Sequence, residues 1–301
     1  NQARVRSLLV CAGLVLAACR PVAECPSLPP ARLELAPRLL SETGLNDPST
    51  RAYEPRFPLW SDGASKRRWI RLPPGARIDN ADPDAWQFPV GTKLWKEFAL
   101  DGKRLETRLL LRAEDEWLFV AYAWNDAQTD AELLPEGATA VLGTRHSIPA
   151  ATQCQGCHLG TASRVLGFSG VQLEGTTLSP QKLFDEGWLT TAPPSYQVPG
   201  DAKTQAALGY LHANCSHCHN QTRPPEGEAR CWNPERRFDF QVRVATQAQT
   251  NALNTIGAPG TPSWRDVLAR AGRTSAQGGM PPLAKDVVDA DGLATLRAFV
   301  E

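Results

Sequence analysis

The sequence predicts an α+β protein of several domains, with antiparallel β structure first and helices after it. Apolar and polar residues alternate from Leu105 to Leu111, as they do along a strand. The pair Asp101-Gly102 just before this stretch is typical of a β-hairpin turn. Apolar residues recur at helical spacing near the end of the chain, from Val288 to Val300. A length of 301 residues favours about two domains.

Composition indicates a packed globular protein. Hydrophobic residues make up 42% of the chain and charged residues 21%, which excludes the class of intrinsically disordered proteins. The 32 Lys and Arg residues balance the 32 Asp and Glu residues. This neutrality disfavours a nucleic-acid binder, whose affinity depends on neutralising phosphates. We therefore expect no nucleic-acid partner.

Residues 1–18 have the layout of a bacterial secretory signal. Arginines precede an apolar run from Leu8 to Leu16, which is shorter than the roughly 20 residues of a membrane span. Two alanines then precede Cys19, which resembles a lipobox, so we expect acyl chains on Cys19 to anchor the protein. An ordinary cleaved signal and an uncleaved anchor are the alternatives. The expected location is the periplasmic side of the outer membrane or the cell surface, with residues 19–50 as lipidated N-terminus and linker.

Residues 51–138 are predicted to form an antiparallel, β-sandwich-like domain. A strand from Thr92 to Leu100 pairs through the hairpin turn with the strand around Leu105 to Leu111, and a third strand follows from Trp117 to Trp124. The segment 61–63 is interpreted as a turn. Six tryptophans are expected in the core, although their number also suits a face against a bound group: Trp60, Trp69, Trp86, Trp95, Trp117 and Trp124.

Four cysteines form two copies of one motif. Residues 154–158 (CQGCH) and 215–219 (CSHCH) both have the pattern Cys-x-x-Cys-His, the attachment sequence of c-type haem. Two thiols three positions apart can bond to both vinyl groups of one porphyrin, and the adjacent histidine then reaches the iron. A zinc site and a redox-active dithiol are alternatives, but neither needs the histidine. The sequence thus predicts two covalently attached haem c groups, held by Cys154, Cys157 and His158 and by Cys215, Cys218 and His219.

The order of elements after residue 200 is similar to a class I cytochrome c domain. Asp201 is expected to cap a helix that leads into the second motif, and a terminal helix capped by Asp289 or Asp291 follows the only methionine, Met280. Residues 201–301 therefore form the predicted cytochrome c-like domain with the second haem. Residues 139–200, with a short helix from Ser179-Pro180, form the first haem segment and are too short for a complete cytochrome fold.

The axial ligands differ between the two predicted haems. Met280 lies between a glycine pair and a proline pair, so we expect it to bind the second iron opposite His219; a core filler is the alternative. No methionine is left for the first haem. Its sixth ligand is then His146, His212 or His217, which the sequence does not rank, or its iron is five-coordinate.

The two remaining cysteines of the exported chain are Cys25 and Cys231. A disulfide between them suits an oxidising compartment, and two buried free thiols are the alternative.

The chain resembles a poorly characterised family of secreted bacterial diheme c-type cytochromes. The resemblance covers about residues 40–301 and lies in separated strings that match in order: 57–66 (FPLWSDGASK), 106–109 (ETRL), 122–125 (YAWN) with 130–131 (DA), 210–220 (YLHANCSHCHN) and 280–283 (MPPL). It implies haem attachment at both motifs, ligation by His158 and His219, and a role for Met280. His217 belongs to the family string, which raises its weight as a ligand or haem contact.

Three functions follow from these predictions. The leading one is a non-catalytic electron relay between partner proteins, such as a donor dehydrogenase or other cytochromes. The second is a diheme peroxidase-like enzyme with a five-coordinate first haem and a distal acid–base residue such as His146. The third is a binding module, in which the β domain recognises a protein or glycan and the haems report on it. The coordination state of the first iron separates the first two.

Overall fold

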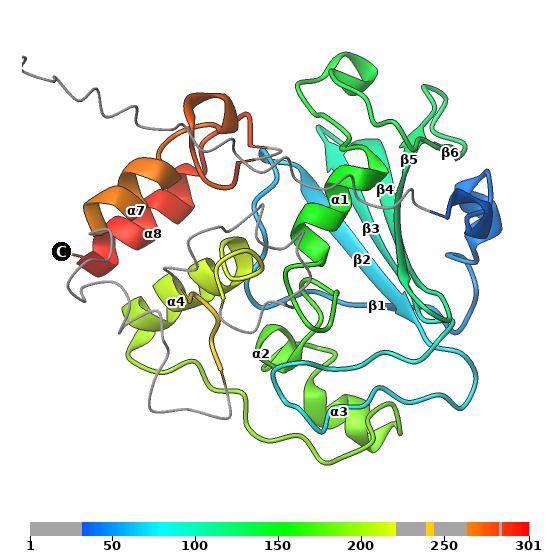
Figure 1. Ribbon diagram of the computed structural model, residues 1–301, viewed down its shortest axis with the longest axis horizontal. Coiled ribbons are helices and arrows are strands. Elements are labelled where there is room, and N and C mark those ends of the chain that lie inside the picture. The colour runs from blue at the N-terminus through cyan, green and yellow to red at the C-terminus, as the bar shows by residue number, and fades with distance from the viewer. Residues whose placement is uncertain (1–31, 221–238, 244–263, 283–284, 301) are drawn as a thin grey trace, which may run out of the picture.

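The computed structural model describes residues 32–220, 239–243, 264–282 and 285–300. Within them an antiparallel sheet comes first and a helical region follows (Figure 1), so the predicted α+β class is confirmed. The predicted signal, the lipidation site Cys19 and the cysteines Cys25 and Cys231 lie outside the described residues.

The sheet is a six-stranded meander in which each strand pairs with the next along the chain. The strands are β1 (Arg51–Ala52), β2 (Ser65–Arg71), β3 (Lys93–Leu100), β4 (Lys103–Arg112), β5 (Trp117–Trp124) and β6 (Ala131–Leu133). The predicted hairpin is confirmed: Asp101 and Gly102 have φ values of 50° and 78° between β3 and β4, the left-handed pair that a two-residue hairpin turn favours.

Both faces of the sheet are covered, but by different layers. Trp95 and Leu109 face the N-terminal 3-10 segments η1 (Leu33–Leu35) and η2 (Leu40–Thr43) in one apolar cluster. The opposite face carries Phe119 and packs against the helical region, and we call it the inner face. The described strands form one sheet, so the prediction of a sandwich-like domain is corrected: the second layer is helical, because apolar residues of the later helices complete this core.

The main helices of the described residues follow the sheet in sequence. They are α1 (Ala151–His158), α2 (Gly170–Leu173), α3 (Pro180–Asp185), α4 (Ala202–Asn214), α7 (Trp264–Ala271) and α8 (Ala290–Val300), with 3-10 turns η3 (Val141–Gly143) and η4 (Ser275–Gln277).

The predicted helix caps are confirmed. The Ser179 hydroxyl accepts a hydrogen bond from the Lys182 amide at the start of α3. The Asp201 carboxylate accepts one from the Thr204 amide at 2.9 Å, and Asp289 accepts one from the Gly292 amide at 2.9 Å. Of the two predicted caps of the last helix, Asp289 therefore holds the position, and Asp291 lies in the first turn.

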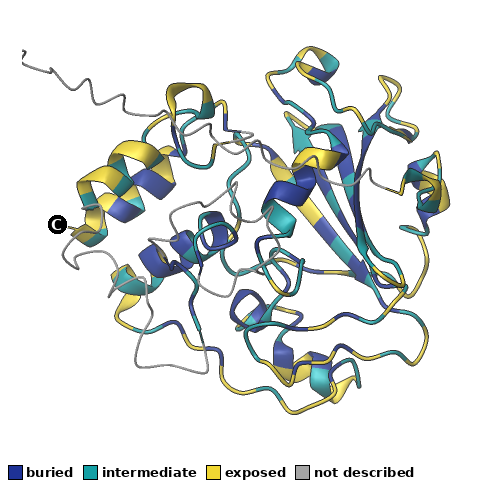
Figure 2. Ribbon diagram, viewed as in Figure 1, coloured by how far each residue is buried: buried dark blue, intermediate teal, exposed yellow. Residues whose placement is uncertain are grey.

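Helices α4, α7 and α8 form a packed group beside the sheet, and α1 lies between them and the strands (Figure 1). Gly292 lets α8 approach α4 closely, because a Cβ there would lie 2.1 Å from the Tyr210 ring. The Trp264 and Phe299 rings meet edge to face at 5.3 Å and join α7 to α8. The buried faces of α1 and α4 turn toward the interior, whereas α7 and α8 expose their outer sides (Figure 2).

None of the described helices has both the length and the apolar character that crossing a membrane requires.

Candidate functional site

The first cysteine motif forms helix α1 and ends it. Cys154 and Cys157 are three residues apart and therefore share one face of the helix. Helix α1 packs against β5. At its end the His158 ring stacks on the Phe119 ring, with centroids 4.5 Å apart and an angle of 25° between the planes. The sheet therefore supports the motif histidine from one side.

The His158 ring is oriented by a backbone carbonyl. Its Nδ1 lies 2.8 Å from the Arg164 carbonyl oxygen. Because a carbonyl only accepts, Nδ1 carries the proton and Nε2 keeps its lone pair. Burial lowers the pKa of His158 to about 3, so the ring is neutral near pH 7. A neutral imidazole whose Nδ1 donates to a carbonyl has the form that metal-binding histidines usually take.

The second motif begins where α4 ends. Cys215 caps the helix, and the His219 amide donates back to its carbonyl at 2.9 Å. Burial raises the pKa of the Cys215 thiol to about 12. The Phe240 amide donates to the His219 carbonyl at 2.9 Å, and the two rings meet edge to face at 5.6 Å. The segment 239–243 therefore packs against this histidine through Phe240.

The two motifs are in direct contact. The thiols of Cys157 and Cys218 lie near each other, and the interaction between them, together with burial, raises the pKa of Cys157 well above its ordinary value. A Cβ on Gly160 would lie 1.7 Å from the His217 carbonyl oxygen, so only glycine fits there. Asn220 joins both sides by donating to the Gly160 carbonyl at 2.9 Å and to the Ser216 carbonyl at 2.6 Å. Segments 60 residues apart therefore meet at one site.

The donor groups suit covalently held haem. In the described part of the chain, Cys154, Cys157, Cys215 and Cys218 form no disulfide, and thioether formation requires reduced thiols. Among the described residues, no three His, Cys, Asp or Glu side chains gather into a group that could hold a metal ion by itself. Each thiol pair is followed by a partly buried histidine, which is the donor set that haem attachment needs, and haem attachment stays a prediction.

Of the three candidate histidines for the first haem, two are already engaged. His146 Nε2 lies 2.7 Å from Glu106 Oε1. His212 Nδ1 accepts a hydrogen bond from the Val242 amide at 3.1 Å, and burial lowers the pKa of His212 to about 4. The proton of this neutral ring is therefore on Nε2, which has no lone pair left for a metal.

His217 differs from both. It is 4% exposed, and its Nδ1 has no hydrogen-bond partner among the described residues. A buried ring nitrogen without a partner is rare in folded proteins and points to a missing ligand or ion. His217 is near enough to His158 to contribute to lowering the pKa of that ring.

Met280 lies in a loop that is tied to the helical group. Its amide donates to the Arg270 carbonyl at 3.0 Å, and its carbonyl accepts from Lys285 Nζ at 3.0 Å. Lys285 is 2% exposed and also donates to the Ala271 carbonyl. Its ammonium lies near Cys215. The methionine loop is therefore anchored near the second motif, and the bond from its sulfur to iron stays a prediction.

The segment 57–63 does more than form the predicted turn. The Asp62 carboxylate accepts hydrogen bonds from the amides of Asp286 and Val287, at 3.0 and 2.8 Å. The Trp60 amide donates to Asn214 at 2.7 Å and its indole to the Val287 carbonyl at 3.0 Å. This segment therefore joins the end of α4 to the start of α8. Sequence analysis missed it, because no local pattern pairs residue 62 with residue 286.

A buried ion pair lies on the inner face of the sheet. Glu106 is 0% exposed and binds Arg108 at 2.9 and 2.7 Å. Burial alone would raise the pKa of Glu106, but the attraction of Arg108 and the hydrogen bonds from His146 and Arg108 hold it below its ordinary value. The alternation in β4 predicted a half-buried strand, with the side that carries Glu106 and Arg108 facing solvent. This side is instead buried, because the helical layer packs over it.

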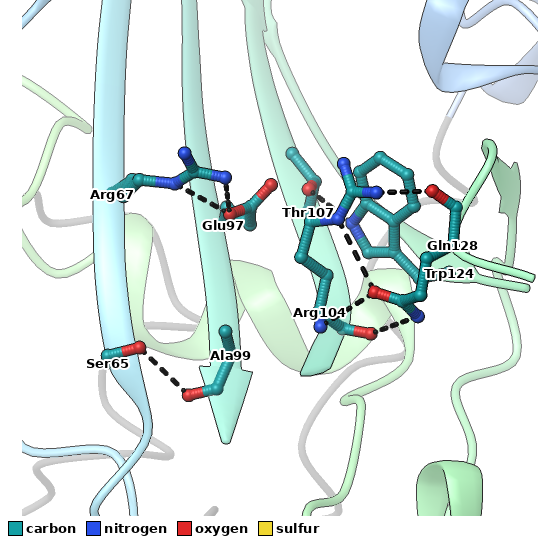
Figure 3. A network of polar contacts seen from close by, with 8 residues as sticks. All are labelled: Ser65, Arg67, Glu97, Ala99, Arg104, Thr107, Trp124 and Gln128. Carbon is teal, nitrogen blue, oxygen red and sulfur yellow. Dashed lines mark hydrogen bonds and ion pairs between the residues drawn. The ribbon is translucent and has the colours of Figure 1, made fainter. Parts of the chain in front are cut away.

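The opposite face of the sheet has a separate polar network (Figure 3). Arg67 binds Glu97 at 2.9 and 2.6 Å. Arg104 lies 3.5 Å over the Trp124 ring and binds Gln128. A shallow hollow beside this network contains no cysteine or histidine. These contacts join β2 to β3, and β4 to β5 and the turn after it, and have no evident chemical role.

Comparison of the chain with protein-family models, with curated proteins and with solved structures found no match.

Proposed function

We propose that the chain is a diheme c-type cytochrome that relays electrons between partner proteins, such as a donor dehydrogenase or other cytochromes. The observation that carries this proposal is the direct contact between the segments of the two Cys-x-x-Cys-His motifs, where Asn220 donates to the Gly160 carbonyl and Gly160 packs against His217. Two redox groups fastened at such neighbouring motifs would exchange electrons over a short distance. Lipid on Cys19 would keep the protein at the periplasmic side of the outer membrane or at the cell surface.

The residues of each motif have distinct roles in this proposal. The four thiols would fasten the two groups, and His158 and His219 would each supply one iron ligand. The Arg164 carbonyl holds the His158 ring in the ligating tautomer. When bound, each haem iron supplies a reversible one-electron couple. The surrounding apolar residues exclude water, and the chain itself undergoes no covalent change.

The helical region supports a class I cytochrome c-like arrangement for the second haem. Helix α4 leads into the second motif and packs against the last helix, α8. The methionine loop is anchored between α7 and Lys285. We assign Met280 as the second ligand of this iron. A thioether ligand favours reduced iron and raises the reduction potential, so the second haem would be the high-potential centre.

We assign His217 as the second ligand of the first haem. Its buried Nδ1 has no partner among the described residues, whereas ring nitrogens of His146 and His212 are engaged. The substitution His217→Ala should therefore convert the first haem to a high-spin form that binds carbon monoxide. His212→Phe is the control and should leave the low-spin spectrum unchanged. An unchanged spectrum in His217→Ala would remove this ligand.

The proposal is tested by counting covalent haem. The protein is produced in a bacterial host that attaches c-type haem during export, and haem per chain is measured after denaturation. We expect two haems in the wild type, one in Cys154→Ala/Cys157→Ala and one in Cys215→Ala/Cys218→Ala. The control Cys25→Ser should keep two. A wild type with no covalent haem, or with zinc in its place, would overturn the proposal.

The enzyme alternative requires an open first iron. Carbon monoxide binding to the reduced wild type, together with consumption of peroxide, would favour a peroxidase-like enzyme over a relay. We expect neither, because His217 would close the first iron and Met280 the second. Two reversible one-electron waves in voltammetry are the expected behaviour of the relay.

A further inference from the structure

Three cations form a continuous row across the inner face of the sheet. Strand pairing sets Arg68 opposite Lys96 and Lys96 opposite Arg108. Adjacent strands are about 4.8 Å apart, so the row brings three positive charges within roughly 10 Å. Like charges directly opposite one another destabilise a sheet. Such a row therefore needs a counter-charge.

The protein itself supplies little of that counter-charge. Arg108 is paired with Glu106. Arg68 is 7% exposed and has no side-chain hydrogen bond or ion pair with any described residue; the one carboxylate that stabilises its charge is that of the exposed Glu54. The Lys96 ammonium lies over the Phe98 ring at 4.8 Å, and the carboxylate that stabilises its charge is that of Glu106, which is already paired with Arg108. Burial, reinforced by Arg68 and Arg108, lowers the pKa of Lys96 well below its ordinary value.

The other face of the same strands makes the contrast clear. There Arg67, one position before Arg68, is paired with Glu97 (Figure 3). Lys93, three positions before Lys96, donates to the Thr43 carbonyl at 2.7 Å. The outer-face cations Arg67 and Lys93 thus each have a partner of their own, whereas Lys96 shares Glu106 with Arg108 and Arg68 has no ion pair with a described residue. A buried charge with too little counter-charge is costly, so the inner row suits an anion from outside the chain.

The row lies beside the first motif. Phe119, which stacks on His158, is two positions before Ala121, and Ala121 pairs with Arg108. Two residues along a strand span about 6.7 Å. A planar ligand fastened to the thiols of the first motif and seated on His158 would therefore extend over this part of the inner face, beside the row.

We propose that Arg68, Lys96 and Arg108 bind the carboxylates of the ligand that the first motif holds. This inference rests on the proposed function, in which that ligand is the first haem and the carboxylates are its two propionates. Lys66 lies at the end of the row, where its ammonium donates to the Leu59 carbonyl at 2.8 Å and is near Asp62 and Asp289. It is therefore engaged within the chain. Cations at the propionates stabilise reduced iron, because reduction adds a negative charge nearby.

The test is redox titration of the holoprotein after the haem count has been made. Arg68→Gln and Lys96→Met should shift the ratio of oxidised to reduced first haem several-fold toward the oxidised form at a fixed potential. A tenfold shift corresponds to about 59 mV for one electron. The first haem is identified as the low-potential centre, because the methionine-ligated second haem lies higher. The second haem should be unchanged.

Matched variants separate this effect from a general loss of charge. Arg67→Gln and Lys93→Gln remove the same charges from the outer face and should shift neither haem. Lys96→Arg keeps the charge in the row and should keep the wild-type potential. Suppose that the variants keep two haems per chain, and that Arg68→Gln and Lys96→Met shift the oxidised-to-reduced ratio of the first haem no more than the outer-face variants do. That result would overturn the assignment of the row to the propionates and would leave the proposed function standing.

A second arm distinguishes propionates from a free carboxylate ligand. Succinate is titrated into the holoprotein by calorimetry. We expect no binding, because the propionates occupy the row. Binding in the wild type that is lost in Arg68→Gln, but kept in Arg67→Gln, would assign the row to a free dicarboxylate and overturn the propionate assignment.

Discussion

Glu106 is the carboxylate on which the inner face of the sheet depends. It is fully buried and binds both Arg108 and His146. Removing one partner of a buried ion pair leaves an uncompensated charge, so Glu106→Gln should lower the free energy of unfolding by about 3 kcal/mol at pH 7. Glu97→Gln is the matched control on the outer face. Its partner Arg67 is 65% exposed, so we expect a loss of about 0–1 kcal/mol.

The pH dependence of this loss has a definite sign. The pKa of folded Glu106 lies below its ordinary value of 4.5, so the ionised group adds stability above pH 4.5. That contribution disappears as the pH falls through the folded pKa. Denaturant unfolding should therefore show a full difference between wild type and Glu106→Gln at pH 7 and a shrinking one below pH 4.5. A constant difference down to strongly acid pH would contradict the buried ion pair.

Gly160 tests the contact between the two motifs. A Cβ there would lie 1.7 Å from a backbone oxygen of His217, which cannot move as a side chain can. Gly160→Ala should therefore destabilise the protein by about 1–3 kcal/mol through overpacking. Gly272→Ala is a milder control, because its Cβ would meet the Leu268 carbonyl oxygen at 3.2 Å. Equal midpoints of thermal unfolding for the two variants would argue against a tight contact.

Local spacing predicted the residues of the site but not their surroundings. The pattern Cys-x-x-Cys-His is complete within five positions, so residues 154–158 and 215–219 were found directly. The support of His158 by Phe119, the engagement of His212 by Val242 and the pairing of Asp62 with residues 286–287 all join distant positions. Such contacts depend on how the elements pack, and no pattern in one sequence encodes them.

The start of α8 shows how two similar residues differ at the level of an element. Asp289 accepts the Gly292 amide and lies near Tyr210 of α4, whose pKa it helps to raise. Asp289→Ala should therefore cost about 1 kcal/mol for the lost cap. Asp291→Ala removes a charge within the first turn and should cost less than about 0.5 kcal/mol. Equal losses in chemical denaturation would contradict Asp289 as the cap.

Strands and helices were predicted well because their signals are local. Alternation and the Asp101-Gly102 turn placed β3 to β5 within about two residues of their observed bounds, and the caps Ser179 and Asp201 marked α3 and α4. The layer opposite the sheet was predicted wrongly. An apolar strand face has the same sequence pattern whether a second sheet or a helix covers it. In addition, Arg68, Lys96 and Arg108 give the inner face a polar sequence pattern, so the sequence does not indicate that this face is buried.

At the scale of the whole molecule, the sheet and the helical region share one core. Apolar residues of the sheet and of the later helices belong to the same cluster, which includes Phe119, Phe168 and Leu208. The site itself spans this boundary, since the first motif lies on the sheet and touches the second motif. The predicted division into a β domain and later segments stays a prediction, but the two regions share this apolar cluster.

This shared core predicts one unfolding transition. Fluorescence of the sheet tryptophans, among them Trp95 and Trp124, and absorbance of the haems should change at the same denaturant concentration, as two-state unfolding requires. Asp62→Ala removes two hydrogen bonds between the sheet side and the start of α8. Each is worth about 1 kcal/mol, so both signals should shift together to lower denaturant. Asp47→Ala, which removes a partly exposed ion pair with Arg71, should shift neither by much. If Asp62→Ala moved the haem signal and left the tryptophan signal in place, the two regions would be separate cooperative units.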